Sequence, residues 1–186
     1  METYYDIYQL NNFIYDLLFE YDFDPKNVLE IMTRDKYKLH IKNAIKGDPT
    51  SQYYIANFYN DGEYIPKNEE KGFYWNRKAA IYGIPIAQYN LAEYYLENPI
   101  NKDESKAFKW YLKLANENKL RAIYLVAKCH RDGIGTDKNS KEATKWIEKF
   151  ISNYYGNIHI PITLKDFLNG SDINIKLLVS IYEPEK

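Results

Sequence analysis

The residues most able to do chemistry lie together in the run CHRDGIG, residues 129–135. Its His-Arg-Asp tripeptide also occurs in the catalytic loop of protein kinases, but Asp137 stands where that loop needs an asparagine, and no glycine-rich loop accompanies it. Cys129 and His130 are adjacent, so on a helix their side chains diverge by about 100° and do not form a nucleophile–base pair. We therefore expect a buried cysteine and a helix that ends in a turn.

The other candidate sites are equally incomplete. His40, His130 and His159 do not have the spacing of metal ligands. The run GIGT at 133–136 lacks the Gly-Lys pair that would follow it in a phosphate-binding loop. The run NGS at 169–171 is a formal glycosylation acceptor, which matters only in a secreted protein. The sequence therefore predicts no enzyme activity, no cofactor and no metal site.

Composition restricts the class of protein further. A chain of 186 residues fits one structural unit, and its net charge of −1, with basic residues scattered among acidic ones, does not form a nucleic-acid-binding stripe. No uncharged run approaches the roughly 18 apolar residues of a membrane span, and the acidic N-terminal region lacks the basic start of a signal peptide. The single cysteine cannot form an internal disulfide. We expect no nucleic-acid or membrane partner, and a location in the cytoplasm or in the cytosol of a host.

The elements that position these residues are repeats. Trp75, Trp110 and Trp146 are the only tryptophans, and they lie 35 and 36 residues apart. A small residue precedes each tryptophan by three positions and so shares its helical face. Four residues before each small residue stands a side chain suited to an N-cap, namely Asn68, Asp103 or Asn139. The pattern predicts three equivalent helices, which we call the second helices.

A second block recurs before each tryptophan block. It reads SQYYIANFYNDG at 51–62, AQYNLAEYYLEN at 87–98 and AIYLVAKCHRDG at 122–133. The first, fifth, eighth and ninth positions of the block form a stripe with helical period. We call these amphipathic segments the first helices. Helix pairs of about 36 residues that stack on one another describe an α-solenoid.

The repeat extends toward the N-terminus by half a unit. AIKGDPTSQ at 44–52 recurs as AIYGIPIAQ at 80–88, and Gly83 and Asn118 suit a left-handed conformation at a helix end. The sequence NIHIPI alternates like a strand, so the C-terminal region is a cap, a β-hairpin or an extension. The predicted units are an N-terminal helical cap at 1–34, an array at 35–153 and a C-terminal cap or extension at 154–186. Within the array we place a half repeat at 35–50 and repeats at 51–86, 87–121 and 122–153.

These motifs resemble the Sel-like repeat (SLR) family of α-solenoids. The shared pattern is Ala-x-Tyr-x-(Leu/Ile/Val)-Ala-x-x-Tyr, then Asp-Gly, then the tryptophan block, over 44–153. Tetratricopeptide repeats, with a 34-residue period and a short turn, fit less well. The resemblance implies an all-α, right-handed solenoid of antiparallel helix pairs with about three and a half repeats. Two departures from the family stand out: ENPINKDE at 97–104 is one residue short, and Phe150-Ile151 replaces Ala-Ala and closes the array.

The resemblance also implies a binding face, because first helices line the concave surface of similar solenoids. Three positions of the block, the third, seventh and tenth, point away from the apolar stripe and form the predicted partner-binding face: Tyr53, Asn57, Asn60, Tyr89, Glu93, Leu96, Tyr124, Lys128 and Arg131. Tyrosines suit recognition because each offers a rigid aromatic surface and a polar tip. The alternative is that these tyrosines only pack against neighbours. The tryptophans are interpreted as structural, with an aromatic ligand box as the alternative.

The resemblance implies a protein-interaction module, an adaptor or scaffold for another protein or peptide. Two alternatives stay open. The chain could be a regulatory subunit or a paralogue of the repeat region of a longer, kinase-like enzyme, or a structural protein that self-associates through its ends. We expect a monomer.

Overall fold

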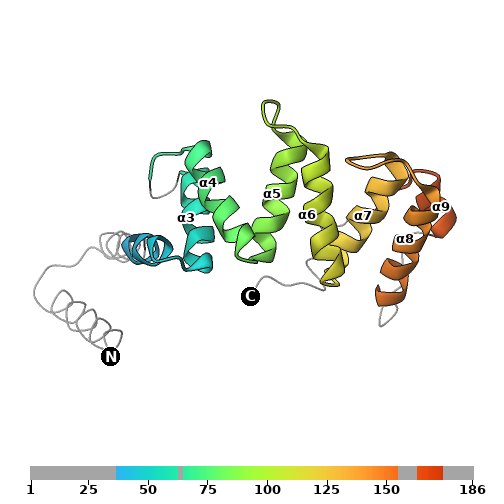
Figure 1. The fold of residues 1–186 in the computed structure, drawn as a ribbon, viewed down its shortest axis with the longest axis horizontal. Coiled ribbons are helices and arrows are strands. Elements are labelled where there is room, and N and C mark those ends of the chain that lie inside the picture. Colours follow the sequence, from blue (N-terminus) through green and yellow to red (C-terminus); the bar gives the residue numbers. More distant parts are fainter. Residues whose placement is uncertain (1–36, 63–64, 155–162, 174–186) are drawn as a thin grey trace, which may run out of the picture.

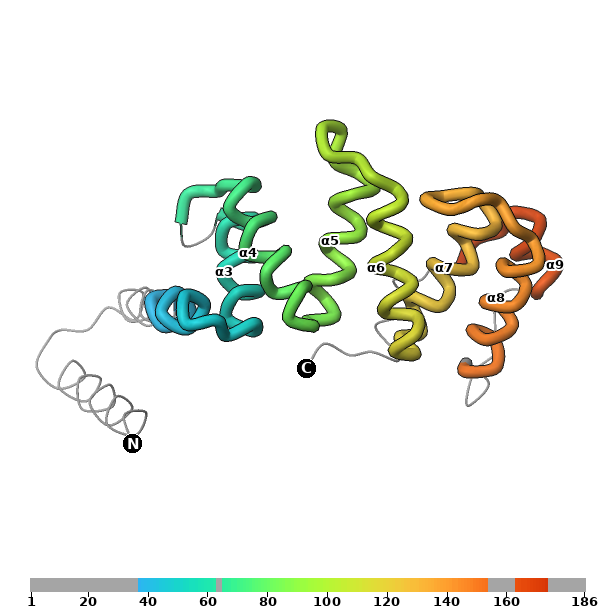
Figure 2. Tube along the Cα trace, in the orientation of Figure 1, coloured from blue at the N-terminus to red at the C-terminus, as the bar shows by residue number. Residues whose placement is uncertain are grey.

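The computed structural model describes residues 37–62, 65–154 and 163–173, which form an extended row of helices without strands (Figure 1). Residues 37–45 are helical and precede seven further helices. These are α3 (Pro49–Asp61), α4 (Glu69–Ile81), α5 (Pro85–Glu97), α6 (Glu104–Asn116), α7 (Leu120–Asp132), α8 (Ser140–Tyr154) and α9 (Leu164–Leu168). Each packs against its neighbours in the chain, which is the arrangement of a solenoid. Figure 2 traces the chain up and down along the row.

The second helices begin where their N-caps predict. The side chains of Asn68, Asp103 and Asn139 accept hydrogen bonds from backbone amides three residues later, at 2.9, 2.9 and 3.1 Å. Each bond satisfies an amide that has no partner inside its own helix. The prediction of three N-caps, and with it the start of α4, α6 and α8, is confirmed.

The joints between helix pairs explain the recurring Ala-Ile-x-Gly segment. Gly83 and Asn118 have φ angles of 95° and 59°, which confirms the predicted left-handed turns. The side-chain amides of Gln52 and Gln88 donate to the carbonyls of the alanines eight residues earlier, at 3.3 and 3.0 Å. The retained glutamine therefore joins the end of one pair to the start of the next. In the third repeat Ile123 takes this position and is fully buried.

The loop of the second repeat turns differently from the others, as its missing residue predicts. Helices α3 and α7 end at Gly62 and Gly133, with φ angles of 71° and 79°, whereas α5 ends at Asn98 with φ −72°. The Asn98 side chain accepts hydrogen bonds from the amides of Ile100 and Asn101 at 3.0 and 2.8 Å. An asparagine side chain thus closes the turn that glycine closes in the other two repeats.

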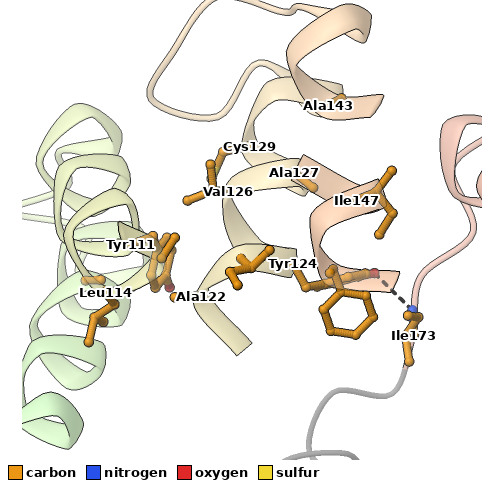
Figure 3. Packing of buried hydrophobic residues seen from close by; sticks show 14 of the residues in the cluster. Tyr111, Leu114, Ala122, Tyr124, Val126, Ala127, Cys129, Ala143, Ile147 and Ile173 are labelled. Carbon is orange, nitrogen blue, oxygen red and sulfur yellow. Dashed lines mark hydrogen bonds between the residues drawn. The ribbon is translucent and has the colours of Figure 1, made fainter. Parts of the chain in front are cut away.

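The core runs through the array and is lined by small residues. Alanines of both helix types have no exposed surface, and aliphatic side chains of neighbouring repeats fill the space between them (Figure 3). The three tryptophans are only half-buried, and a lysine three residues later lies over each ring, at 5.1 to 5.3 Å from its centroid. The interpretation of the tryptophans as structural stays a prediction, and each ring is partly open to solvent. The ammonium group of the lysine lies over each of these rings.

The described part of the C-terminal region docks on the last repeat. Thr163 and Asp166 form a capping box at the start of α9, and Phe167 is buried, with its ring centroid 5.6 Å from that of Tyr124. The predicted cap at 1–34 and the strand-like run at 157–162 lie outside the described residues. Within the described ranges, no helix is long and apolar enough to cross a bilayer.

Candidate binding face

The first helices α3, α5 and α7 present the predicted face, but each repeat presents it differently. In α3, Asn60 is exposed, while Tyr53 and Asn57 are half-buried. The Tyr53 ring lies 6.0 Å from that of Tyr54, which is exposed. This repeat therefore offers neutral amides and aromatic edges at its surface.

The second repeat uses the same positions to join the next repeat. Tyr89 is 4% exposed, and the guanidinium of Arg121, from the first turn of α7, lies 4.6 Å from its ring centroid. Arg121 also forms an ion pair with Glu93, whose side chain is 40% exposed. Leu96 is half-buried against the core. The face is continuous from α5 to α7 because an arginine bridges the two helices.

The third repeat holds a segment of its own chain. The Tyr124 hydroxyl donates to the Asp172 carboxylate at 3.1 Å. It also accepts from the Ile173 amide at 3.0 Å, the bond drawn as a dashed line in Figure 3. Lys128 forms an ion pair with the other oxygen of Asp172. The contacts reach both the side chain and the backbone of residues 163–173.

Arg131 makes the largest set of contacts to this segment. One terminal nitrogen donates to the carbonyls of Phe167 and Ser171 at 3.0 and 3.2 Å, and the other donates to Asp172 at 2.8 Å. The guanidinium stacks 4.6 Å from the centroid of the Phe167 ring and also pairs with Asp132. A planar group with several fixed donors suits this combination of carbonyl, carboxylate and ring.

Charges in the cluster stabilise one another. Hydrogen bonds from Arg131 lower the pKa of Asp132. Burial alone would raise the pKa of Asp172, but hydrogen bonds from Lys128 and Arg131 outweigh burial and lower it. Burial raises the pKa of Tyr124 to about 12, so its hydroxyl remains a donor at neutral pH. The site therefore presents two cations and a neutral phenol to a carboxylate.

The structure corrects one assumption about this face. Tyr89, Tyr124 and Arg131 are 4%, 1% and 7% exposed, although the helical period places them outside the packing stripe. A first helix in a solenoid packs against the second helix of its own repeat and against the next repeat. More of its circumference is therefore buried than in a helix that packs against a single neighbour. Whether the nine residues bind a partner stays a prediction.

Sequence reasoning missed the residues that complete the face. Arg121 lies at the second position of its helix, and Phe167 and Asp172 lie beyond the last repeat, where no period applies. Contacts such as Arg131 to Asp172 join residues 41 apart. The one signal in the sequence was the pair of basic residues, Lys128 and Arg131, on α7, which suggests an acidic partner.

Cys129 and His130 both pack among neighbouring side chains. Cys129 is buried, and burial raises the pKa of its thiol to about 12, which keeps it protonated and a poor nucleophile. The neighbouring His130 ring packs at 5.3 Å against Phe108. Across the described ranges, no group of three or more His, Cys, Asp or Glu side chains could hold a metal ion.

Solved structures share this architecture. A Sel1 repeat protein from Oxalobacter formigenes is 30% identical and superimposes with a TM-score of 0.58, covering 71% of this chain and 96% of that one. The protein c5321, a protective antigen of uropathogenic Escherichia coli strains that displays an SLR fold, is 26% identical with a TM-score of 0.56. That match covers 63% of this chain and 25% of c5321.

A curated relative is similar in sequence. The chitin synthase regulator SKT5 of Saccharomyces cerevisiae is 30% identical over 129 residues, which is 66% of this chain, and the chain spans only 18% of the length of that protein. The sequence model of the Sel1 repeat matches residues 49–81, 85–119 and 120–154, more than half of the chain. These three matches coincide with the helix pairs α3–α4, α5–α6 and α7–α8. The chain therefore belongs to the Sel1 repeat family.

Proposed function

We propose that the protein is a binding module, an adaptor or scaffold that holds a partner protein or peptide on the face of its first helices α3, α5 and α7. One observation carries the proposal: in the third repeat this face already holds residues 163–173 through contacts to a carboxylate, an amide and two carbonyls. A face that binds a segment of its own chain has the donors and aromatic surfaces that a segment of a partner requires.

Family membership supports the same role. Proteins with Sel1 repeats are generally scaffolds for protein interaction. The proposal includes no catalytic step, cofactor or metal, and no nucleic-acid or membrane partner. It places the protein, as a monomer, in the cytoplasm or in the cytosol of a host.

A second candidate function is the regulation of an enzyme through the same face. The name of SKT5 as a chitin synthase regulator favours it, since the match covers 66% of this chain. Regulation would then be one use of binding, with the enzyme as the partner. The two candidates differ in what copurifies, an enzyme or another protein.

Affinity purification from the native cell, with matched variants, tests the proposal. Asn57→Arg places a long cation on the face in α3, where the asparagine is half-buried. Arg77→Glu changes an exposed charge on the neighbouring second helix α4 and serves as the control. We expect the wild type and Arg77→Glu to retain the same partner, and Asn57→Arg to lose it.

The opposite pattern would contradict the proposal. If Asn57→Arg, folded by circular dichroism, retains the partner while Arg77→Glu loses it, the second helices form the binding surface. Turnover of a substrate by the isolated chain would contradict the part of the proposal that gives the protein no catalytic activity.

A further inference from the structure

We propose that Tyr124, Lys128 and Arg131 form a recognition site for an acidic peptide, and that residues 163–173 occupy this site until such a peptide displaces them. The inference rests on the proposed function and adds to it the chemistry of the ligand and a means of regulation. We call these three residues the acid-binding cluster.

The contacts at the cluster are those by which a protein recognises a peptide. Asp172 receives hydrogen bonds or ion pairs from all three side chains of the cluster. The following amide, of Ile173, donates to Tyr124. Arg131 also binds two backbone carbonyls, which any peptide supplies. The specificity therefore lies in the carboxylate, and the backbone contacts fix its register.

Charge makes an acidic ligand necessary. With Asp172 removed, the ion pairs left to Lys128 and Arg131 within the described part of the chain would reduce to the pair between Arg131 and Asp132. Arg131 is 7% exposed, so water cannot fully replace the lost carboxylate. Lys128 would lose its ion pair, and Arg131 would lose one of its two carboxylate partners, so a carboxylate from another peptide is the group that restores both contacts.

An aromatic side chain adds a second recognition point. Phe167 lies between the Arg131 guanidinium, at 4.6 Å, and the Tyr124 ring, at 5.6 Å. It precedes the carboxylate of Asp172 by five residues. The ligand class is therefore a peptide with an aromatic residue five positions before an aspartate.

The occupying segment buries few side chains, which permits displacement. Within residues 163–173 only Phe167 and Ile173 are buried, while Lys165, Asp166 and Leu168 are exposed. Its helix α9 has five residues, which is too short to be stable without its contacts to α7 and α8. Segments with few buried side chains are the ones that open before the rest of a fold.

Binding of a labelled peptide to the full-length chain tests the inference. The peptide has the sequence of residues 163–173, TLKDFLNGSDI, and its binding is followed by fluorescence anisotropy. Asp172→Ala and Asp172→Asn weaken the internal contact, and Lys165→Ala changes an exposed residue of the same segment as the control. We expect both Asp172 variants to bind the peptide at least about tenfold more tightly than the wild type and Lys165→Ala do.

A second peptide, with asparagine in place of the aspartate that corresponds to Asp172, tests the need for a carboxylate. We expect it to bind the Asp172 variants at least about tenfold more weakly. Two results would overturn the inference: folded Asp172 variants that bind no better than the wild type, or equal binding of the acidic and the amide peptide. The first would make residues 163–173 a permanent cap, and the second would exclude the carboxylate as the basis of recognition. The proposed function would fail separately, if Asn57→Arg kept the native partner and Arg77→Glu lost it.

Discussion

Equivalent residues on the three first helices differ in charge, and we expect this difference to affect what each repeat can bind. The seventh position of the block holds Asn57, Glu93 and Lys128, which are neutral, negative and positive. Glu93 pairs with Arg121 and Lys128 pairs with Asp172, so two of the three already have partners within the chain. The retained tyrosine is buried in the second and third repeats, so we expect the variable position to contribute more to specificity.

Trp110 should contribute more to stability than its lysine does. Its ring packs against two groups of buried residues, one around α7 and one at the joint between α4 and α5. The Lys113 ammonium lies over the ring at 5.3 Å from its centroid. We expect Trp110→Ala to lower the free energy of unfolding by about 3 kcal/mol, because a large side chain leaves the core. Lys113→Met keeps the apolar stem and should cost at most about 1 kcal/mol. Thermal denaturation checks both, and an unchanged midpoint for Trp110→Ala would refute the structural role of the ring.

The lowered pKa of Asp172 predicts that the free energy of unfolding decreases at acidic pH. Its folded pKa lies below that of the unfolded chain, so its contribution is fully present above about pH 4 and is lost as the pH falls through the folded pKa. Urea denaturation of the wild type and of Asp172→Asn measures this. We expect the wild type to be more stable at pH 7, with the difference shrinking below pH 4. A difference that persisted unchanged in strong acid would exclude the ion pairs as its source.

At the scale of the elements, local sequence signals predicted most of what the structure has. The N-caps, the left-handed joints at Gly83 and Asn118 and the altered loop after α5 each depend on residues within one or two turns. The docking of α9 was not predictable in this way, because it depends on Arg131 and on a carboxylate 41 residues away. A single long-range contact leaves no period in the sequence.

Gly135 fixes the loop between α7 and α8 against α6. It has φ 68°, and a β-carbon there would overlap the carbonyl oxygen of Glu104. Gly83 also has a left-handed φ, but a β-carbon there would meet nothing within 4 Å. We expect Gly83→Ala to cost about 1 kcal/mol and Gly135→Ala to cost about 2 kcal/mol more, because only the second requires backbone to move. Equal urea midpoints for the two variants would contradict this close approach.

At the scale of the whole molecule, the repeats form a continuous row and the segment 163–173 covers part of its last pair. A covered end argues against open-ended stacking of chains. The periods of 35 and 36 residues predicted the row, but the identity of a partner is not encoded in any period. It depends on the exposed side chains of the first helices, which vary from repeat to repeat.

Coverage of the last pair predicts the oligomeric state. We expect light scattering to give the monomer mass of 22.2 kDa for the wild type at all concentrations. Phe167→Asp places a charge in the contact with Tyr124 and should detach the segment, expose apolar surface and raise the mean mass. Leu168→Asp, at an exposed neighbouring position, should remain monomeric. A wild-type dimer would instead favour self-association as the function.

Hydrogen–deuterium exchange of the full chain, alone and with the partner recovered from the native cell, tests the central claim most directly. If the first helices form the binding face, the partner should slow exchange in α3, α5 and α7. Slower exchange confined to α4, α6 and α8 would contradict the account, because it would place the partner on the tryptophan-bearing helices.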